Sequence, residues 1–466
     1  MPGKAIPFPA TPFAMSAIPE SLIRKYNTAG PRYTSYPTAL RFRDDLAPED
    51  RPATFAPADG LISLYIHIPF CPSLCRYCGC STVITTLKGV STTYLDHLEQ
   101  EIALWRARLA PGLRVAQLHF GGGTPSYLTA PEIDRLAAML RAAFEFTPDA
   151  EISVELDPRR LDRERVEAFY RLGCRRASLG VQDFDPKVQK LINRIQSFDI
   201  TREAVQWLRE TGYASVNLDL IYGLPHQTVE SIDRTIDRVL ELEPDRLAVF
   251  SYAHIPWLKP AQKILENSGA LPLPEQKVAL FRQILNRFTE TGYAAIGLDH
   301  FAKQDDELAV AFREGHLQRN FQGYSTRPEL PMLGLGLTSI SQTPEAFHQN
   351  EKELPAYYAA IEAGRLPVAK GLRLTDEDRR RALIIRTLMC DLALDYAKLS
   401  AALGLDFAAT YAAELAKLAP LADDGLVEIS PEAARVTPTG RFFLRNLAMV
   451  FDQYLETAAN RHSKTL

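Results

Sequence analysis

The sequence has few cysteines, no surplus of positive charge and no long apolar run. Disulfide frameworks belong to small secreted domains, whereas this chain has six cysteines in 466 residues. Its 53 basic and 57 acidic side chains leave a formal net charge of −4, so the composition gives no sign of a nucleic-acid partner. No stretch approaches the roughly 18 apolar residues of a membrane-spanning helix. We therefore expect neither a nucleic-acid partner nor a membrane.

The start of the chain also lacks the apolar core of a signal peptide, because four prolines interrupt its first 12 residues. Clustered thiols without an export signal indicate a reducing compartment, so we expect a cytoplasmic protein. The apolar fraction of 46% and the charged fraction of 24% are those of a soluble globular protein, and the length allows two or three domains. We expect a monomer, because no exposed apolar stripe stands out.

What the sequence does have is a concentration of cysteine. Cys71, Cys75, Cys78 and Cys80 lie within ten residues, directly after segment 61–68, whose apolar and β-branched residues predict a buried strand. The loop therefore follows the carboxyl end of a strand, where parallel α/β folds build their sites. Soft thiolates select iron–sulfur clusters, zinc or Cu(I). Three closely spaced thiolates can hold a [4Fe–4S] cluster and leave one iron open to a substrate or cofactor.

Zinc is the main alternative for these thiols. Structural zinc sites use two ligand pairs separated by a long spacer, and no second pair follows this loop. We interpret Cys80 as a thiol near the site, because a fourth protein ligand would leave no iron open. Cys174 and Cys390 lie in apolar segments and are expected to be packing residues.

Strands and helices alternate from residue 61 onward, which predicts an α/β fold with a parallel sheet and crossover helices. Six units fall short of the eight that close a barrel, so the expected fold is a partial (β/α)6 barrel of the TIM type. The candidate strands are 61–68, 115–120, 151–156, 175–180, 215–221 and 245–251.

Two further parts flank the expected catalytic domain, which runs from 56 to 345. Residues 1–55 are Pro-rich and weakly periodic, which indicates an extended N-terminal arm that is partly disordered at its start. Residues 298–324 predict a long irregular region. From residue 346 to 466, amphipathic helical patterns followed by a small hairpin predict a mostly helical, winged-helix-like C-terminal domain.

Polar residues follow the predicted strands. A barrel brings the carboxyl ends of its strands together, so these residues are expected to share one site. Glycines allow a close backbone approach to a ligand, and carboxylates suit ribose hydroxyls and an ammonium group. In chain order the signals are Gly121-Gly122-Gly123-Thr124, Glu155 and Asp157, Gln182, Asp219, and Ala253-His254.

The spacing of Cys71, Cys75 and Cys78 resembles the C-x3-C-x2-C motif of the radical S-adenosylmethionine enzymes. In that superfamily the open iron of a [4Fe–4S] cluster takes the amino and carboxylate groups of S-adenosylmethionine, and reduction releases a 5′-deoxyadenosyl radical. Further segments are similar to one family within it, the oxygen-independent coproporphyrinogen III oxidases or coproporphyrinogen dehydrogenases. These segments are 31–39, 78–80, 299–302, 306–309 and 320–324.

This resemblance implies an anaerobic step of haem biosynthesis, in which two propionates of coproporphyrinogen III become vinyl groups of protoporphyrinogen IX. It implies a reducing donor such as flavodoxin or ferredoxin and an unknown electron acceptor. It also implies two S-adenosylmethionine molecules. Tyr65, Gly122, Glu155 and Ile340 would contact the cluster-bound one. The second would be lined by Tyr77, Gly123, Thr124, Gln182, Arg194, Asp219 and Ala253.

The residues expected at the reacting centre are Tyr65, Cys80 and Arg32, with Arg32 offering a forked hydrogen bond to a substrate carboxylate. An ordinary ordered loop is the simpler interpretation of the Arg32 segment. Two other functions stay open. One is a haem chaperone of the same superfamily, which generally lacks the cysteine at 80 and the long arm. The other is a radical enzyme that acts on a different substrate.

Overall fold

The computed structural model describes residues 18–45, 59–321, 323–327, 330–455 and 462–466. The expected disordered start of the arm and its residues 46–55 lie outside this described part. Within it, no helix combines the length and the apolar character needed to cross a membrane.

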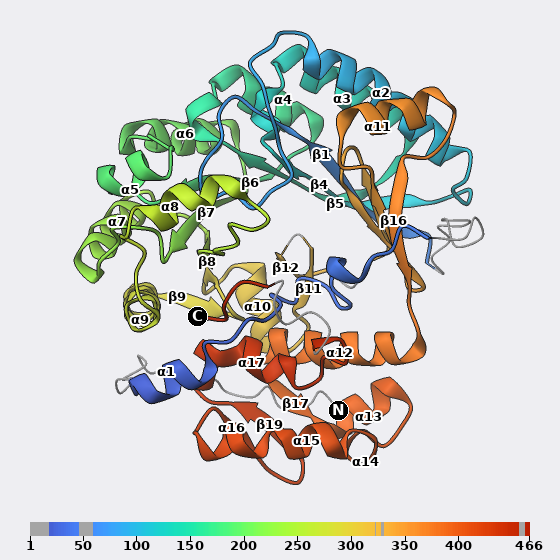
Figure 1. Cartoon of the computed structure of the whole chain (residues 1–466). Helices are drawn as coiled ribbons and strands as arrows, with labels where there is room; N and C mark the ends of the chain where they lie inside the picture. The colour runs from blue at the N-terminus through green and yellow to red at the C-terminus, as the bar shows by residue number, and fades with distance from the viewer. Residues whose placement is uncertain (1–17, 46–58, 322, 328–329, 456–461) are drawn as a thin grey trace.

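A sheet of twelve strands forms the centre of the molecule (Figure 1). Seven of them are parallel neighbours, in the order β13 Met332–Leu335, β1, β4, β5, β6, β7 and β8. β13 was not predicted as a strand. The other six each correspond to a predicted strand, which confirms the predicted α/β fold with a parallel sheet. Their bounds are Leu61–Ile68, Arg114–Gly122, Glu145–Leu156, Arg176–Gln182, Ser215–Tyr222 and Arg246–Ser251.

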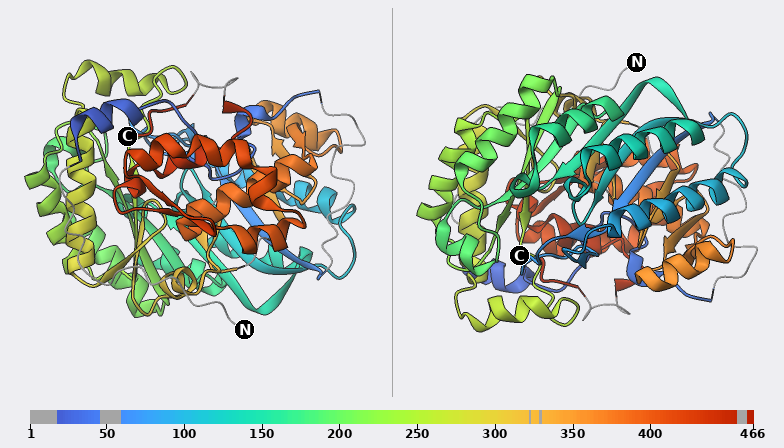
Figure 2. Two further views of the ribbon diagram at one scale, coloured as in Figure 1. Left: turned by 90° about the horizontal axis from the view of Figure 1, so that it is seen from below. Right: turned by 90° about the horizontal axis from the view of Figure 1, so that it is seen from above.

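The crossover helices cover one face of this sheet, which we call the outer face (Figures 1 and 2). The sequence explains the packing of α7, where Ile232, Ile236 and Val239 recur at helical spacing and are fully buried. Ser197 caps the start of α6 by accepting a hydrogen bond from the backbone of Ile200. The helices are α2 Val90–Arg106, α3 Ala130–Ala143, α4 Arg163–Leu172, α5 Pro186–Leu191, α6 Phe198–Thr211 and α7 Val229–Glu241.

The opposite face, which we call the inner face, is polar. Alternate residues of β1, such as Ile62, Leu64 and Ile66, are completely buried against the helices. The intervening residues form polar rows across the sheet. In one row Tyr65 pairs with His119, and in another Glu155 pairs with Ser178. When helices cover both faces of a parallel sheet, the side chains on both faces are apolar. The polar side chains on the inner face of this sheet therefore indicate a ligand cavity.

Short strands extend the sheet at both edges. Within the predicted irregular region 298–324, the structure has β10 His300–Lys303, α10 Glu307–Glu314, β11 Gln318–Asn320 and β12 Gly323–Ser325, so that prediction was wrong. Strands of three or four residues are too short to show a hydrophobic period. The remaining added strands are β9 Tyr293–Ile296, β13 Met332–Leu335, β14 Ile340–Gln342, β15 Ala346–Asn350 and β16 Val368–Arg373.

The C-terminal part lies on the inner side of the sheet (Figure 1). It is mostly helical with one small sheet of β17, β19 and β18, as predicted. The main sheet continues past residue 346, the expected start of this domain, because β15 and β16 belong to it. The C-terminal elements are α12 Asp376–Asp391, β17 Ala393–Asp395, α13 Tyr396–Leu403, α14 Phe407–Thr410, α15 Ala412–Lys417, α16 Ala419–Asp423, β18 Val427–Ile429, β19 Ala433–Val436, η6 Gly440–Phe443 and α17 Leu444–Met449.

The described part of the arm packs on this C-terminal domain. It begins with a short helix, α1 Glu20–Tyr26, and the Tyr26 ring contacts the Phe443 ring with centroids 5.5 Å apart. The backbone N–H of Gly30 donates to the carbonyl of Ser463 over 3.1 Å. Two ends of the chain are thereby held together beside the inner face.

Candidate functional site

The cysteine loop is held at both ends by backbone pairing. Cys71 ends β2 Phe70–Cys71, which pairs with β3 Val83–Ile84. Between them the loop docks on the end of α5, where the Arg76 guanidinium donates to the Leu191 carbonyl over 2.8 Å. The Asn193 amide donates to the carbonyl of Leu74 over 2.9 Å. The thiols therefore occupy a defined place at the carboxyl ends of the parallel strands.

The three thiols of the motif lie close enough to influence one another. Burial and the negative charges of Cys78 and Cys75 raise the pKa of Cys71 to about 12. A hydrogen bond with Cys80 is the main reason why the pKa of Cys78 falls to about 6. The Lys259 ammonium, which donates to the Cys80 carbonyl over 2.6 Å, adds to that effect. Cys80 therefore lies next to Cys78, one of the motif thiols.

This donor set fits an iron–sulfur cluster. Three thiolates that repel one another need a positive group between them, and the irons of a cluster supply it. Among the described side chains, no three His, Cys, Asp or Glu converge on the position of a single metal ion. Cluster ligands bind different irons and so stand farther apart than the ligands of one ion.

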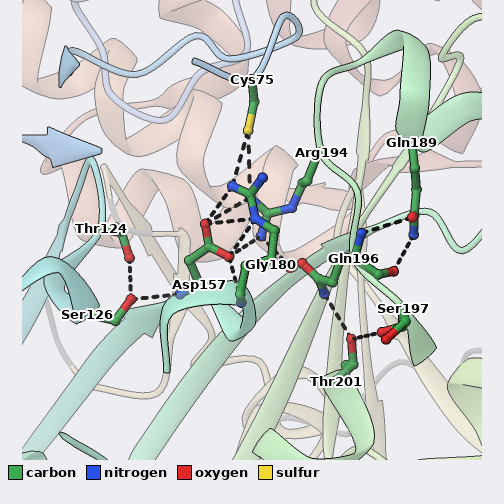
Figure 3. Close-up of polar contacts among 11 residues, drawn as sticks. Cys75, Thr124, Ser126, Asp157, Gly180, Gln189, Arg194, Gln196, Ser197 and Thr201 are labelled. Atoms are coloured by element: carbon green, nitrogen blue, oxygen red, sulfur yellow. Dashed lines mark hydrogen bonds and ion pairs between the residues drawn. The ribbon is translucent and has the colours of Figure 1, made fainter. Parts of the chain in front are cut away.

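Asp157, just after β5, is the centre of the charge network beside the cysteines (Figure 3). Its carboxylate accepts from the Arg159 guanidinium over 2.6 Å and from the Arg194 guanidinium over 3.3 Å. Both guanidiniums also donate toward the Cys75 sulfur, over 3.6 and 3.7 Å. Burial opposes the ionisation of Asp157, but the two arginines outweigh it and hold its pKa below the usual range. Two cations and one anion thus surround this thiol.

The glycine run after β4 makes room for the protein's own backbone. A Cβ atom on Gly123 would lie 2.4 Å from the Pro69 carbonyl oxygen. Gly122 has a φ of +116°, and a Cβ there would collide with the His67 ring. The next residue, Thr124, is buried, and its hydroxyl bonds the Ser126 hydroxyl over 2.7 Å. These glycines therefore let the end of β4 lie directly against the start of the cysteine loop.

Glu155 is fixed on the inner face by its neighbours. His119 bonds the Glu155 carboxylate through Nε2 over 3.1 Å and the Ser153 hydroxyl through Nδ1 over 2.7 Å. The Tyr65 ring stacks on the imidazole, with centroids 6.0 Å apart. Burial works against ionisation, but the hydrogen bond and charge of His119 keep the pKa of Glu155 below its usual value. Since 48% of its side chain is exposed, this carboxylate is available to a ligand.

A second carboxylate, Asp219, shares this face on β7. It accepts from the Asn217 amide over 2.7 Å. Burial, together with the negative charge of Glu155, raises the pKa of Asp219 to about 7. A ligand ammonium or hydroxyl group between Glu155 and Asp219 would favour the ionised form of both carboxyl groups.

Four other predicted residues meet in two pairs. The Gln182 amide and the Arg194 guanidinium both lie over Gly180, whose added Cβ would be 2.9 Å from each. Tyr77 and Ala253 are joined by the fully buried Gln262, which donates to their carbonyls over 3.1 and 3.2 Å. Sequence reasoning did not single out Gln262, and no motif marks it.

Two predicted residues come from outside the six-strand unit, and only one of them, Ile340, lies beside the site. Ile340 starts β14, and its carbonyl oxygen lies 2.5 Å from where a Cβ on Gly334 would stand, beside the strand position paired with Tyr65. Arg32 lies elsewhere, where its guanidinium donates to the Ser251 carbonyl at the end of β8. No described contact joins Arg32 to the cysteine loop. Arg159 was missed, although its neighbour Asp157 was recognised as a strand-end signal.

The chain is similar to known proteins over nearly its whole length. Residues 65–239 match the Radical SAM superfamily, and residues 374–443 match the HemN C-terminal domain. The chain is 46% identical to the oxygen-independent coproporphyrinogen III oxidase of Escherichia coli (strain K12) over 94% of this chain and 96% of that protein. It is 40% identical to the enzyme of that name from Helicobacter pylori (strain J99), over 97% and 100%. The solved structure of coproporphyrinogen III oxidase (HemN) from Escherichia coli, described as a radical SAM enzyme, superimposes with a TM-score of 0.86 at 42% identity, covering 94% of this chain and 100% of that one.

Proposed function

This chain belongs to the radical S-adenosylmethionine superfamily and, within it, to the oxygen-independent coproporphyrinogen III oxidases, and we propose that it acts on coproporphyrinogen III. It decarboxylates two propionates oxidatively to vinyl groups and so yields protoporphyrinogen IX. The observation that carries this function is the extent of the match, since 46% identity over 94% of the chain covers far more than the cysteine loop.

The cofactors are a [4Fe–4S] cluster and S-adenosylmethionine. When bound, they supply a carbon radical that can take a hydrogen atom from an unactivated propionate carbon. We assign Cys71, Cys75 and Cys78 as the cluster ligands, because their loop is fixed at both ends and their thiols are adjacent. Arg159 and Arg194 offset the negative charge of Cys75.

The inner-face acids are suited to hold the cluster-bound S-adenosylmethionine. Glu155 is ionised, half exposed and fixed by His119, so it can accept from an ammonium group or a hydroxyl. Tyr65 is stacked on His119 and holds that ring in place. We assign Gly122 and Ile340 to the same molecule through their backbones, which lie beside Glu155 and beside Gly334 of β13 respectively.

A second S-adenosylmethionine would lie nearer β6 to β8. The supporting feature is that Gln182 with Arg194, and Tyr77 with Ala253, are gathered in two pairs at the ends of these strands. Asp219 faces them from β7. Gly123 and Thr124 complete the proposed set from the end of β4.

The remaining assignments concern the substrate and the electrons. We assign Arg32 to bind a substrate carboxylate, and we assign Cys80 as a thiol at the reacting centre. A flavodoxin or ferredoxin would supply the reducing electron. A cytoplasmic monomer suits free thiols and a site that must stay reduced.

The test is an anaerobic assay of the reconstituted protein with S-adenosylmethionine, a strong reductant and coproporphyrinogen III. Mass spectrometry should show two successive losses of a carboxyl group with a hydrogen atom, together with 5′-deoxyadenosine. Cys75→Ala should abolish the cluster absorbance and both products. Cys174→Ala is the matched control, because that thiol is buried far along the chain from the loop.

Each rival function gives a different result in the same assay. Deoxyadenosine without a changed porphyrin would contradict the assigned substrate while leaving the radical chemistry intact. An intact cluster with neither product, and tight haem binding, would favour the haem chaperone. A wild-type protein that binds zinc instead of iron would contradict the cluster.

A further inference from the structure

A small cavity outside the cluster region is lined by four cationic side chains. They come from three separate parts of the chain: Arg32 from the arm, Lys277 from α9 Pro274–Glu290, and Arg441 and Arg445 from the end of the C-terminal domain. Asp299 is the one acid among the lining side chains. The cavity volume is about 30 Å³. The side chains that line this cavity therefore carry more positive than negative charge.

The one acid in the lining, Asp299, offsets only part of the positive charge of this cavity. Asp299 already bonds His300 over 2.8 Å and lies 3.9 Å from the Arg319 guanidinium. Arg441 is 1% exposed, and its Nε and Nη2 atoms are buried without a hydrogen-bond partner. Among the described residues, the hydrogen bond of its guanidinium is a long one, 3.5 Å to the Ala295 carbonyl. A buried guanidinium with unsatisfied N–H groups is unfavourable, so its position points to an anionic ligand.

The neighbouring cations repeat this pattern. The Nε atom of Arg32 is also buried without a partner. Burial, helped by the charges of Arg32 and Arg445, lowers the pKa of Lys277 to about 7. An anion in the cavity would accept hydrogen bonds from the unpaired N–H groups and would offset the repulsion between the cationic side chains.

Arg445, which lines the same cavity, has the hydrogen bonds expected of an arginine with a structural role. Its guanidinium donates to the carbonyls of Gly30, Pro31, Ser463, Lys464 and Thr465. These bonds fasten the arm to the end of the chain. Arg441 makes no comparable set of bonds, so a structural role does not explain its position.

The size and place of the cavity identify the kind of anion. About 30 Å³ holds roughly two water-sized groups, which matches the two oxygens of one carboxylate and excludes a tetrapyrrole ring. Guanidinium groups bind carboxylates through paired hydrogen bonds. The lining residues Tyr222 and Ser251 end β7 and β8, whereas Glu155 is on β5. Three strand spacings of about 4.8 Å separate β5 from β8.

We propose that the cavity lined by Arg32, Lys277 and Arg441 binds the carboxylate of a propionate that the reaction leaves intact, and so orients the porphyrinogen ring against the radical source. The proposal rests on the proposed function, since it takes the same substrate. The protoporphyrinogen product keeps propionates, so the enzyme must hold carboxylates that it does not remove. The C-terminal domain thereby contributes a substrate-binding residue.

The experiment compares Arg441→Met and Lys277→Met with wild-type holoenzyme, using coproporphyrinogen III under anaerobic conditions. We expect each variant to raise the KM for coproporphyrinogen III about ten- to a hundredfold, the usual effect of losing a charged hydrogen bond. The KM for S-adenosylmethionine and the cluster absorbance should stay within twofold of wild type. Arg441→Met should also melt at the same or a higher temperature, because it removes an unpaired buried charge. Arg441→Lys should recover part of the affinity.

Arg435→Met is the matched control, because Arg435 is exposed on β19 of the same domain. An unchanged KM for coproporphyrinogen III in both cavity variants, with wild-type turnover intact, would overturn the inference and leave the proposed function standing. A lower melting temperature with an unchanged KM would assign Arg441 to structure. If Arg441→Met fails to fold, Lys277→Met decides. Absence of turnover in wild type would instead remove the proposed function and this inference with it.

Discussion

At the scale of single residues, the cysteine site depends on ion pairs as much as on its thiols. The Asp157 side chain is 9% exposed, and its two arginine partners are 16% and 7% exposed. Buried pairs differ from surface pairs, since removing one member leaves the other charged and without water. Asp157 therefore controls both the stability of this corner and the positive charge beside Cys75.

We expect Asp157→Asn to lower the free energy of unfolding by about 3 kcal/mol, measured by chemical denaturation at pH 7. The carboxylate has a lowered pKa, so its contribution is present above its unfolded-state pKa and is lost as the pH falls through the lowered value. The difference between wild type and variant should accordingly shrink in strong acid.

The matched control is Asp134→Asn, which breaks an exposed pair with Arg171 at 2.8 Å. Exposed pairs contribute about 0 to 1 kcal/mol, so this variant should stay close to wild type. If Asp157→Asn and Asp134→Asn lower the free energy of unfolding by the same amount, then the burial of the Asp157 ion pairs has no energetic effect.

At the scale of elements, the cysteine loop and the end of β4 are fitted against each other. The backbone N–H of Gly123 donates to the Ile68 carbonyl over 2.8 Å, and no space remains for a side chain. Gly123→Ala must move backbone atoms, so we expect a loss of about 1–3 kcal/mol in stability and less iron per chain after reconstitution. Iron and sulfide assays with a melting curve measure this.

Gly79→Ala is the control for this change, because a Cβ on Gly79 meets no atom within 4 Å although the residue lies between two cysteines. It should bind a wild-type amount of iron. A Gly123→Ala protein with full iron content and an unchanged melting temperature would contradict the fitted arrangement.

The same elements show how far sequence reasoning reaches. The six parallel strands could be predicted because their apolar residues form runs long enough to have a period. Strands such as β11, with three polar residues, have no such signal, and only pairing with β12 makes them strands. At the site, carboxylates at strand ends were visible in the sequence. Arg159 and Gln262 were not, because the contacts that bring them into the site join residues distant in the chain: Arg159 with the Cys75 sulfur and Gln262 with the Tyr77 carbonyl.

At the scale of the whole molecule, the arm and the end of the chain fasten each other. Thr465 N–H donates to the Thr28 carbonyl over 2.7 Å, and Arg445 bonds carbonyls from both segments. We expect removal of residues 463–466 to lower the free energy of unfolding by about 3 kcal/mol, because several hydrogen bonds of roughly 1 kcal/mol each are lost. Hydrogen exchange at the amides of residues 28–30 should become faster.

Lys464→Ala is the control, since its exposed side chain can be removed while the backbone bonds remain. It should melt like wild type. If the shortened chain keeps wild-type stability and amide protection at residues 28–30, the arm is held by other contacts, such as the Tyr26 ring against Phe443.

The division of the sheet into an apolar outer face and a polar inner face separates two kinds of evolutionary constraint. The outer face carries the packing that keeps the chain folded, whereas the inner face contributes little to the core. Substitutions at exposed inner-face positions, outside the buried ion pairs, can therefore occur at lower cost in stability than substitutions on the outer face. One scaffold can then be adapted to new substrates by changing inner-face and C-terminal residues that do not hold the cofactors. For protein engineering, a library of variants confined to these exposed positions should retain more folded members than a library on the outer face.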